Sequence, residues 1–162
     1  MKLYLIRHGV AEEARAGQSD ADRALTQEGI AKFQKAAAGL VKLVREEGLP
    51  VILTSPLVRA RQTAGILAEA LDNAGIKSQI KPTTALAPGS LIQMLREARQ
   101  SRGPGAAVGH EPFLSECVGR LCFQKAGALE MKKGAVAAIE LAASGTRGEL
   151  IFILPPGILR KL

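Results

Sequence analysis

The chain reads Lys2-Leu3-Tyr4-Leu5-Ile6-Arg7-His8-Gly9 near its start, and this stretch decides the fold class. The apolar run from Lys2 to Ile6 is typical of a buried strand, and the polar residues after it are typical of a loop. Similar short runs at Val51 to Thr54 and Gly105 to Val108 are each followed by a longer, helix-like stretch. Strands that alternate with helices predict an α/β fold with a mainly parallel sheet covered on both faces.

Apolar residues at helical spacing and local capping signals predict four helices. Their expected limits are Thr26 and Gly48 for the first, Pro56 or Leu57 and Gly75 for the second, Ser90 and about Gln100 for the third, and Pro112 for the start of the fourth. Three more strands are expected, a weak one at Ser78 to Lys81 and two at Ala135 to Leu141 and Glu149 to Leu154. The turn through Ser144 to Gly148 would make the last two an antiparallel edge.

Length and composition predict one globular domain over residues 1–162, with 47% hydrophobic residues. No apolar run approaches the ~18 residues of a membrane span. We expect a soluble cytoplasmic protein without a secretory leader. Cys117 and Cys122 cannot form a disulfide framework, and we interpret both as buried small hydrophobes in a reducing compartment.

The net charge of +7 suggests an anionic partner, which could be nucleic acid, an acidic protein or a phosphorylated substrate. With one Tyr, four Phe and no Trp, the chain has few side chains for base stacking, so no nucleic-acid partner is expected. Basic residues are scattered along expected helix faces, namely Lys32, Lys35, Lys42, Arg45, Arg96, Arg99 and Arg102. Lys132, Lys133 and the pair Arg160-Lys161 either guide an acidic partner or aid solubility.

The chain has two histidines. Each follows an expected apolar strand and is adjacent to a glycine in the sequence, in Arg7-His8-Gly9 and Gly109-His110-Glu111. Ligand sites in parallel sheets lie beyond the carboxyl ends of the strands, so both imidazoles are expected at one edge. A single histidine in such a place is more often a structural one. Because both histidines share this placement, we favour a functional role.

A third element, Thr54-Ser55-Pro56-Leu57-Val58-Arg59-Ala60, runs from a strand end into a helix N-terminus. A helix N-terminus favours anions, so Arg59 in the first turn opposes the macrodipole unless an anion lies beside it. We therefore assign Arg59 to a phosphate site. Arg61 is as readily explained as a surface residue.

Arg7, His8, Arg59 and His110 together predict phosphate chemistry. Guanidinium groups bind phosphate oxygens in pairs, and a neutral histidine can attack phosphorus to form a phosphohistidine. Arginines can supply the positive charge that the reaction requires, so neither a metal nor another cofactor is expected.

These three motifs, in this order and spacing, resemble the histidine phosphatase superfamily, also called phosphoglycerate-mutase-like. The chain is most similar to the short SixA-type phosphohistidine phosphatases, through its length, the segment Arg23-Ala24-Leu25-Thr26-Gln27-Glu28-Gly29 and the closing Leu154-Pro155-Pro156. The resemblance implies a three-layer α/β/α fold with His8 as the phosphorylated nucleophile. It also implies a phosphate pocket made by Arg7, Arg59, His110 and Gly9.

The chain departs from the mutase branch in one respect. That branch carries a glutamate, after the third strand, that protonates the leaving oxygen, whereas Thr83 to Gly89 contains no acid here. The first loop offers four carboxylates, Glu12, Glu13, Asp20 and Asp22. Comparison with the SixA-type loop favours Asp20 as the acid, and the alternative is a solvated acidic cluster that balances Arg15 and Arg23.

An alkoxide leaving group benefits from a general acid by ~10²–10⁴-fold, whereas an imidazole leaving group needs less help. The missing glutamate therefore favours a metal-independent phosphatase that removes phosphate from phosphohistidine on a signalling protein. The alternative enzyme is a phosphatase of small phosphomonoesters. A non-catalytic anion-binding module is the least favoured reading, and the sequence predicts no oligomeric state.

Overall fold

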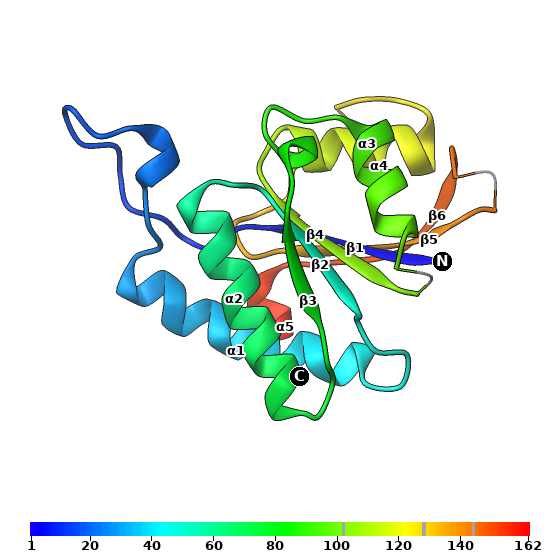
Figure 1. Ribbon diagram of the computed structural model, residues 1–162, viewed down its shortest axis with the longest axis horizontal. Coiled ribbons are helices and arrows are strands. Elements are labelled where there is room, and N and C mark those ends of the chain that lie inside the picture. Colours follow the sequence, from blue (N-terminus) through cyan, green and yellow to red (C-terminus); the bar gives the residue numbers. More distant parts are fainter. Residues whose placement is uncertain (102, 128, 144) are drawn as a thin grey trace.

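The computed structural model describes residues 1–101, 103–127, 129–143 and 145–162. Within these ranges the strands form one sheet in the order β3-β2-β4-β1-β5-β6 (Figure 1). The strands are β1 (Lys2–Arg7), β2 (Val51–Thr54), β3 (Gln79–Pro82), β4 (Gly105–Gly109), β5 (Val136–Leu141) and β6 (Gly148–Leu154). β1 to β4 run parallel, while β5 is antiparallel to β1 and to β6. The predicted mainly parallel sheet with an antiparallel edge is confirmed.

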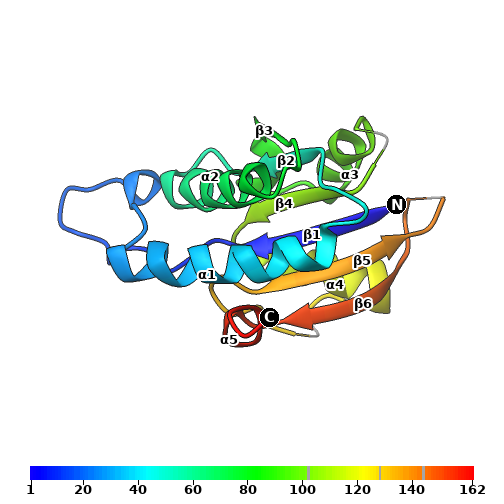
Figure 2. The same ribbon diagram turned by 90° about the horizontal axis from the view of Figure 1, so that it is seen from below.

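Helices cover both faces of the sheet. The helices are α1 (Gln27–Val44), α2 (Val58–Asn73), α3 (Leu91–Arg99), α4 (Phe113–Phe123) and α5 (Pro156–Leu159). Figures 1 and 2 show α1, α2 and α5 on one face and α3 and α4 on the other. The predicted three-layer α/β/α arrangement is therefore confirmed.

The central strand β1 contributes side chains to the hydrophobic cores on both faces of the sheet. Successive side chains of a strand point to opposite faces. Leu3 and Leu5 accordingly pack with α3 and α4, whereas Tyr4 and Ile6 pack with α1, α2 and α5. All four side chains are at most 2% exposed, as expected for a strand that is covered on both faces.

The helix limits follow the capping residues closely. Thr26 Oγ1 accepts a hydrogen bond from the N–H of Gly29 (2.9 Å), and Ser90 Oγ accepts one from the N–H of Gln93 (3.4 Å). α2 ends at Asn73, before the expected Gly75, which has a φ of 79°. A glycine in this left-handed conformation commonly follows a helix end rather than belonging to it.

Several boundary predictions were wrong by small amounts. For example, α1 ends at Val44 and not at Gly48, and β3 starts one residue after Ser78. The short helix α5 was not predicted. Arg102 and Ser144, which were predicted after the third helix and in the last turn, lie outside the described residues.

The two cysteines lie on α4. Cys117 is buried and Cys122 is partly buried, and both are free thiols. In the part of the chain that the structure describes, no helix combines the length and apolar character needed to span a bilayer.

Candidate active site

The two histidines meet at the edge of the sheet where the parallel strands end. His8 follows β1 and His110 follows β4, and these strands are neighbours with Arg7 opposite Gly109. The N–H of His8 donates to the carbonyl oxygen of Gly109 (3.1 Å). The centroids of the two imidazole rings are consequently only 4.9 Å apart.

Contacts around His8 define its tautomer. Its Nδ1 lies 2.7 Å from the carbonyl oxygen of Gly9, and because a carbonyl only accepts, Nδ1 carries the hydrogen. The lone pair of the ring therefore lies on Nε2. Burial lowers the pKa of His8 to about 3, and the charges of Arg59 and Arg7 act in the same direction. His8 is thus a neutral imidazole at neutral pH.

Gly9 links the His8 loop to α2. Its N–H donates to Thr63 Oγ1 (3.1 Å), and the Thr63 hydroxyl donates in turn to the carbonyl of Arg59 (2.7 Å). Both polar backbone groups of Gly9 are therefore engaged within the protein and hold His8 in place. Phosphate binding by Gly9 stays a prediction.

His110 is held by a residue that sequence reasoning did not assign. Its Nε2 lies 2.8 Å from Ser55 Oγ, and the N–H of Ser55 donates to the carbonyl of Val108 (3.0 Å). The His110 Nδ1 is buried and has no partner among the described residues. Burial and the charge of Arg59 lower the pKa of His110 to about 4. The position of Ser55 directly after β2, at the same edge, was the available signal.

Arg59 lies in the first turn of α2 and is 7% exposed. Its Nη1 donates to the backbone carbonyl of Asp20 (2.6 Å) and its Nη2 to the Asp20 carboxylate (2.8 Å). The same carboxylate accepts from Arg23 (2.7 Å). Hydrogen bonds from Arg23 and Arg59 lower the pKa of Asp20, so it is an anion here. Its role as an acid stays a prediction.

Arg7 is the last residue of β1 and directly precedes His8. Its Nη1 donates to the carbonyl of Met131 and lies 3.7 Å from Glu130 Oε1. Its Nε is buried without a partner among the described residues. Sequence reasoning missed Met131, because the contact is made by a backbone carbonyl that any residue type could supply.

The remaining candidates lie outside this cluster. Arg61 is exposed on α2 and borders a surface hollow beside Ile80 of β3. In the first loop Glu12 pairs with Arg15 (3.6 Å), which agrees with the alternative of a solvated, charge-balanced loop for this residue.

The cluster can bind a tetrahedral oxyanion. It combines the buried guanidinium group of Arg59, the partly buried one of Arg7 and two neutral imidazoles. Arg7 Nε and His110 Nδ1 are buried and have no partner among the described residues. Buried polar groups are normally hydrogen-bonded, so a pair of orphaned groups at one site indicates a place for a polar ligand. The described residues contain no group of three metal-ligating side chains.

Comparisons with known proteins identify the family of this chain. Residues 3–86 match the histidine phosphatase superfamily (branch 1). An uncharacterized protein of Picosynechococcus sp. (strain ATCC 27264 / PCC 7002 / PR-6) is 37% identical over an alignment of 167 positions. The alignment covers 96% of this chain and 97% of that protein.

Two solved structures share the fold. The protein histidine phosphatase SixA, complexed with tungstate, has a TM-score of 0.81 at 23% identity and covers 98% of this chain and 99% of its own. The alpha-ribazole phosphatase from Shigella flexneri has a TM-score of 0.65 at 20% identity, covering 96% and 97%.

Proposed function

Because this chain belongs to branch 1 of the histidine phosphatase superfamily, we propose that it is a metal-independent phosphatase that removes the phosphoryl group from phosphohistidine on a signalling protein. One observation carries the proposal: the His8 and His110 rings lie 4.9 Å apart, with the charges of Arg7 and Arg59 acting on both rings. We place this activity in the cytoplasm, where Cys117 and Cys122 would remain free thiols.

His8 is the nucleophile in this proposal. Its Nδ1–H is held by the carbonyl of Gly9, so its Nε2 lone pair can attack phosphorus. A bond from Nε2 to phosphorus forms while the bond to the leaving nitrogen breaks, and that nitrogen keeps the electron pair and takes up a proton. Water then attacks the phosphohistidine, which releases phosphate and restores neutral His8.

Arg7, Arg59 and His110 hold the phosphoryl oxygens. Phosphoryl transfer depends mainly on positioning and on neutralising charge at the equatorial oxygens. Two guanidinium groups supply positive charge for this purpose, which is why the proposal includes no metal. Arg59 would exchange the Asp20 carboxylate for a phosphate oxygen when the substrate binds.

We infer the preference for phosphohistidine from the lack of a protonated carboxyl group that could act as general acid. The segment Thr83 to Gly89 has no carboxylate, and the Asp20 carboxylate is an ion-paired anion. An imidazole leaving group takes its proton readily near neutral pH, whereas an alkoxide depends on a strong general acid. The shared fold with SixA, a protein histidine phosphatase, supports the same substrate class.

Hydrolysis of small phosphomonoesters is the second candidate. It is favoured by the shared fold with an alpha-ribazole phosphatase and by the exposed carboxylate of Asp20, which lies 2.8 Å from Arg59 Nη2. Release of the Arg59 pair by substrate would remove one of the hydrogen bonds that lower the pKa of Asp20. The negative charge of a phosphate bound beside the carboxylate would raise that pKa further and favour the protonated form that a general acid requires.

The test of the nucleophile is a trapping experiment. The enzyme is mixed with ³²P-labelled phosphoramidate, quenched in base, which preserves phosphohistidine, and digested for mapping. We expect label on His8 and none in His8→Gln. Label on another residue refutes the assignment of His8, and phosphate binding without any hydrolysis supports an anion-binding module instead.

A substrate panel tests the preference. Phosphoramidate, a phosphohistidine peptide and several sugar phosphates are compared by kcat/KM. We expect the phosphohistidine peptide to exceed every sugar phosphate by about 100-fold, the lower part of the range for general-acid assistance. A sugar phosphate that matches the peptide identifies the second candidate.

A further inference from the structure

A basic pocket lies next to the candidate active site and has no part in the proposed reaction. It is a cavity of about 210 Å³ whose lining includes Gly9, the residue after the proposed nucleophile. We use the name basic pocket for the four cationic side chains that line it, Lys32, Lys132, Lys133 and Arg160.

Topology brings these cations together from distant parts of the chain. Lys32 lies near the start of α1, the two lysines precede β5, and Arg160 follows α5. Figure 2 shows β1 and β6 ending at the same edge, with α5 beside α1. The lining residues Gly9 and Gly134 therefore place the pocket at the edge of the sheet that carries His8.

The lysine turn is attached directly to the catalytic strand. Gly134, with a φ of 79°, donates its N–H to the carbonyls of both Arg7 and His8 (3.0 Å each). The N–H of Ala135 donates to the carbonyl of Lys132 (2.8 Å). Lys132 and Lys133 are thus held at a defined position relative to the nucleophile, although their side chains are exposed.

Positive charge in the basic pocket is largely uncompensated. Lys32 pairs with Glu28, but Lys132, Lys133 and Arg160 form no ion pair among the described residues. Like charges around one cavity repel each other, so an anionic group placed there is stabilised.

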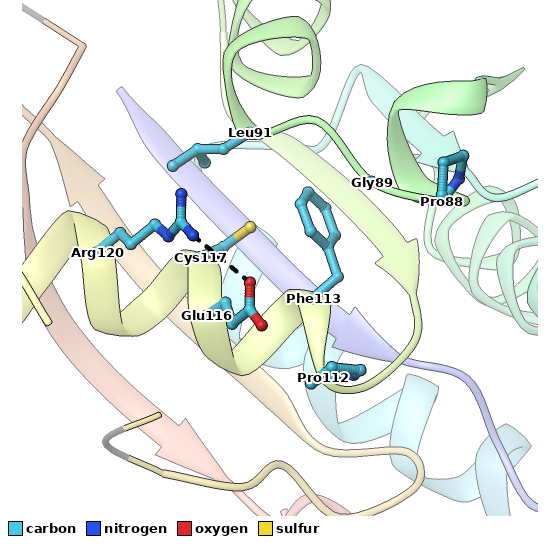
Figure 3. Close-up of a pocket in the computed structure, with 8 residues that line it drawn as sticks. All are labelled: Pro88, Gly89, Leu91, Pro112, Phe113, Glu116, Cys117 and Arg120. Atoms are coloured by element: carbon cyan, nitrogen blue, oxygen red, sulfur yellow. Dashed lines mark ion pairs between the residues drawn. The ribbon is translucent and has the colours of Figure 1, made fainter. Parts of the chain in front are cut away.

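A hollow on the opposite face of the sheet provides a contrast. This hollow of about 230 Å³, between the start of α4 and the loop before α3, is lined by Phe113, Leu91 and Cys117 among others (Figure 3). Its charged lining residues, Glu116 and Arg120, pair with each other at 3.9 Å. The charges there are balanced. Of these two hollows, the basic pocket is the one that combines excess positive charge with a link to His8.

We propose that the basic pocket binds carboxylate side chains of the protein substrate that flank its phosphohistidine. This inference rests on the proposed function and names the surface that its substrate presents. The four cations are at the ends of long, exposed side chains, which suits mobile, salt-sensitive contacts with a protein surface better than tight binding of a small ligand.

The experiment uses three probes. Two are peptides with one phosphohistidine, flanked by glutamates in one and by glutamines in the other, and the third is phosphoramidate. Exposed ion pairs are individually weak, so we expect the wild-type kcat/KM to favour the glutamate peptide by about three- to tenfold at low salt. The preference should vanish in 0.5 M NaCl, where the screening length falls to about 4 Å.

Two matched variants locate the effect. Lys132→Gln/Lys133→Gln/Arg160→Gln should lose the preference for the glutamate peptide and keep phosphoramidate hydrolysis within about twofold, since screened exposed charges contribute little to a small substrate. Arg45→Gln/Lys77→Gln/Arg147→Gln removes three charges near the opposite edge and should keep the preference.

The outcomes separate the two proposals. Equal kcat/KM for both peptides in the wild type, or equal loss in both variants, overturns the basic pocket while the phosphatase stands. Failure of the wild type to hydrolyse any probe overturns the proposed function itself.

Discussion

One exposed acid, Asp20, holds both terminal nitrogens of the buried Arg59. The contacts measure 2.6 Å from Nη1 to the Asp20 carbonyl and 2.8 Å from Nη2 to the Asp20 carboxylate. A carboxylate on the first loop is thus bound to the same guanidinium group that would bind phosphate in the proposed reaction. Binding of substrate and release of this internal contact are therefore coupled.

Asp20→Asn should tighten the binding of inorganic phosphate. The variant removes a negative charge that competes for Arg59, but this carboxylate is 61% exposed, so the pair is worth only about 0.2–1 kcal/mol. We expect the Kd for phosphate, measured by calorimetry, to fall by at most about fivefold. Asp22→Asn, two residues further in the same short turn, is the control and should leave Kd unchanged.

The same variant separates the two roles of Asp20. If Asp20 protonates leaving groups, Asp20→Asn lowers kcat for alkyl phosphates by about 10²-fold and changes kcat for phosphoramidate little. The measurement compares kcat for both substrates across the two Asn variants. Equal, small effects on both substrates would show that Asp20 is not a general acid and serves only to pair with Arg23 and Arg59.

Ser55→Ala should impair catalysis through His110. The hydroxyl lies 2.8 Å from Nε2, and loss of one partner of a buried hydrogen bond costs about 1–3 kcal/mol. We expect kcat/KM for phosphoramidate to fall by about 10- to 100-fold. Ser55→Thr keeps a hydroxyl and should recover most of the activity, whereas equal activity in Ser55→Ala and wild type would show that His110 needs no such support.

Two Gly→Ala substitutions in helices should have opposite effects on stability. A Cβ on Gly39 of α1 would lie 1.9 Å from the carbonyl oxygen of Leu159 in α5, whereas a Cβ on Gly65 of α2 would have no neighbour within 4 Å. Gly65→Ala should raise the free energy of unfolding by about 0.5–1 kcal/mol. Gly39→Ala should lower it by about 1–3 kcal/mol. Urea denaturation of both variants measures the difference.

Periodic features of the chain were predictable from the sequence. The strand and helix pattern follows from side-chain alternation and capping, as at Leu3 to Ile6 and Thr26. It led to the correct fold class, a mainly parallel sheet between two layers of helices. The convergence of His8 and His110 follows from the rule that parallel strands end at one edge. Four-residue α5 has too few positions to show a period, so it left no signal.

Contacts made by backbone atoms or by distant surface residues could not be predicted. The carbonyl of Met131 accepts from Arg7, and the N–H of Gly134 reaches the carbonyl of His8, yet neither depends on a recognisable side chain. Lys32 and Arg160 share a pocket only because of how α5 packs on α1. Such contacts between distant residues depend on tertiary packing, which cannot be inferred from the sequence pattern of a single segment.

Acid should destabilise the protein through its two histidines. The pKa is about 3 for His8 and about 4 for His110 in the folded protein, against 6.5 for an ordinary histidine. Below pH 6.5 the unfolded chain therefore binds more protons than the folded one, and the free energy of unfolding falls as pH falls. The expected loss between pH 6.5 and pH 5 is on the order of 1 kcal/mol per pH unit for each histidine.

Urea unfolding at pH 7, 6 and 5 measures this loss. The variant His8→Gln/His110→Gln lacks both groups and should show the shallower dependence that remains from carboxylates such as Asp20. Parallel curves for the two proteins would mean that the histidines titrate in the native state as they do in the unfolded chain, so that burial does not lower their pKa.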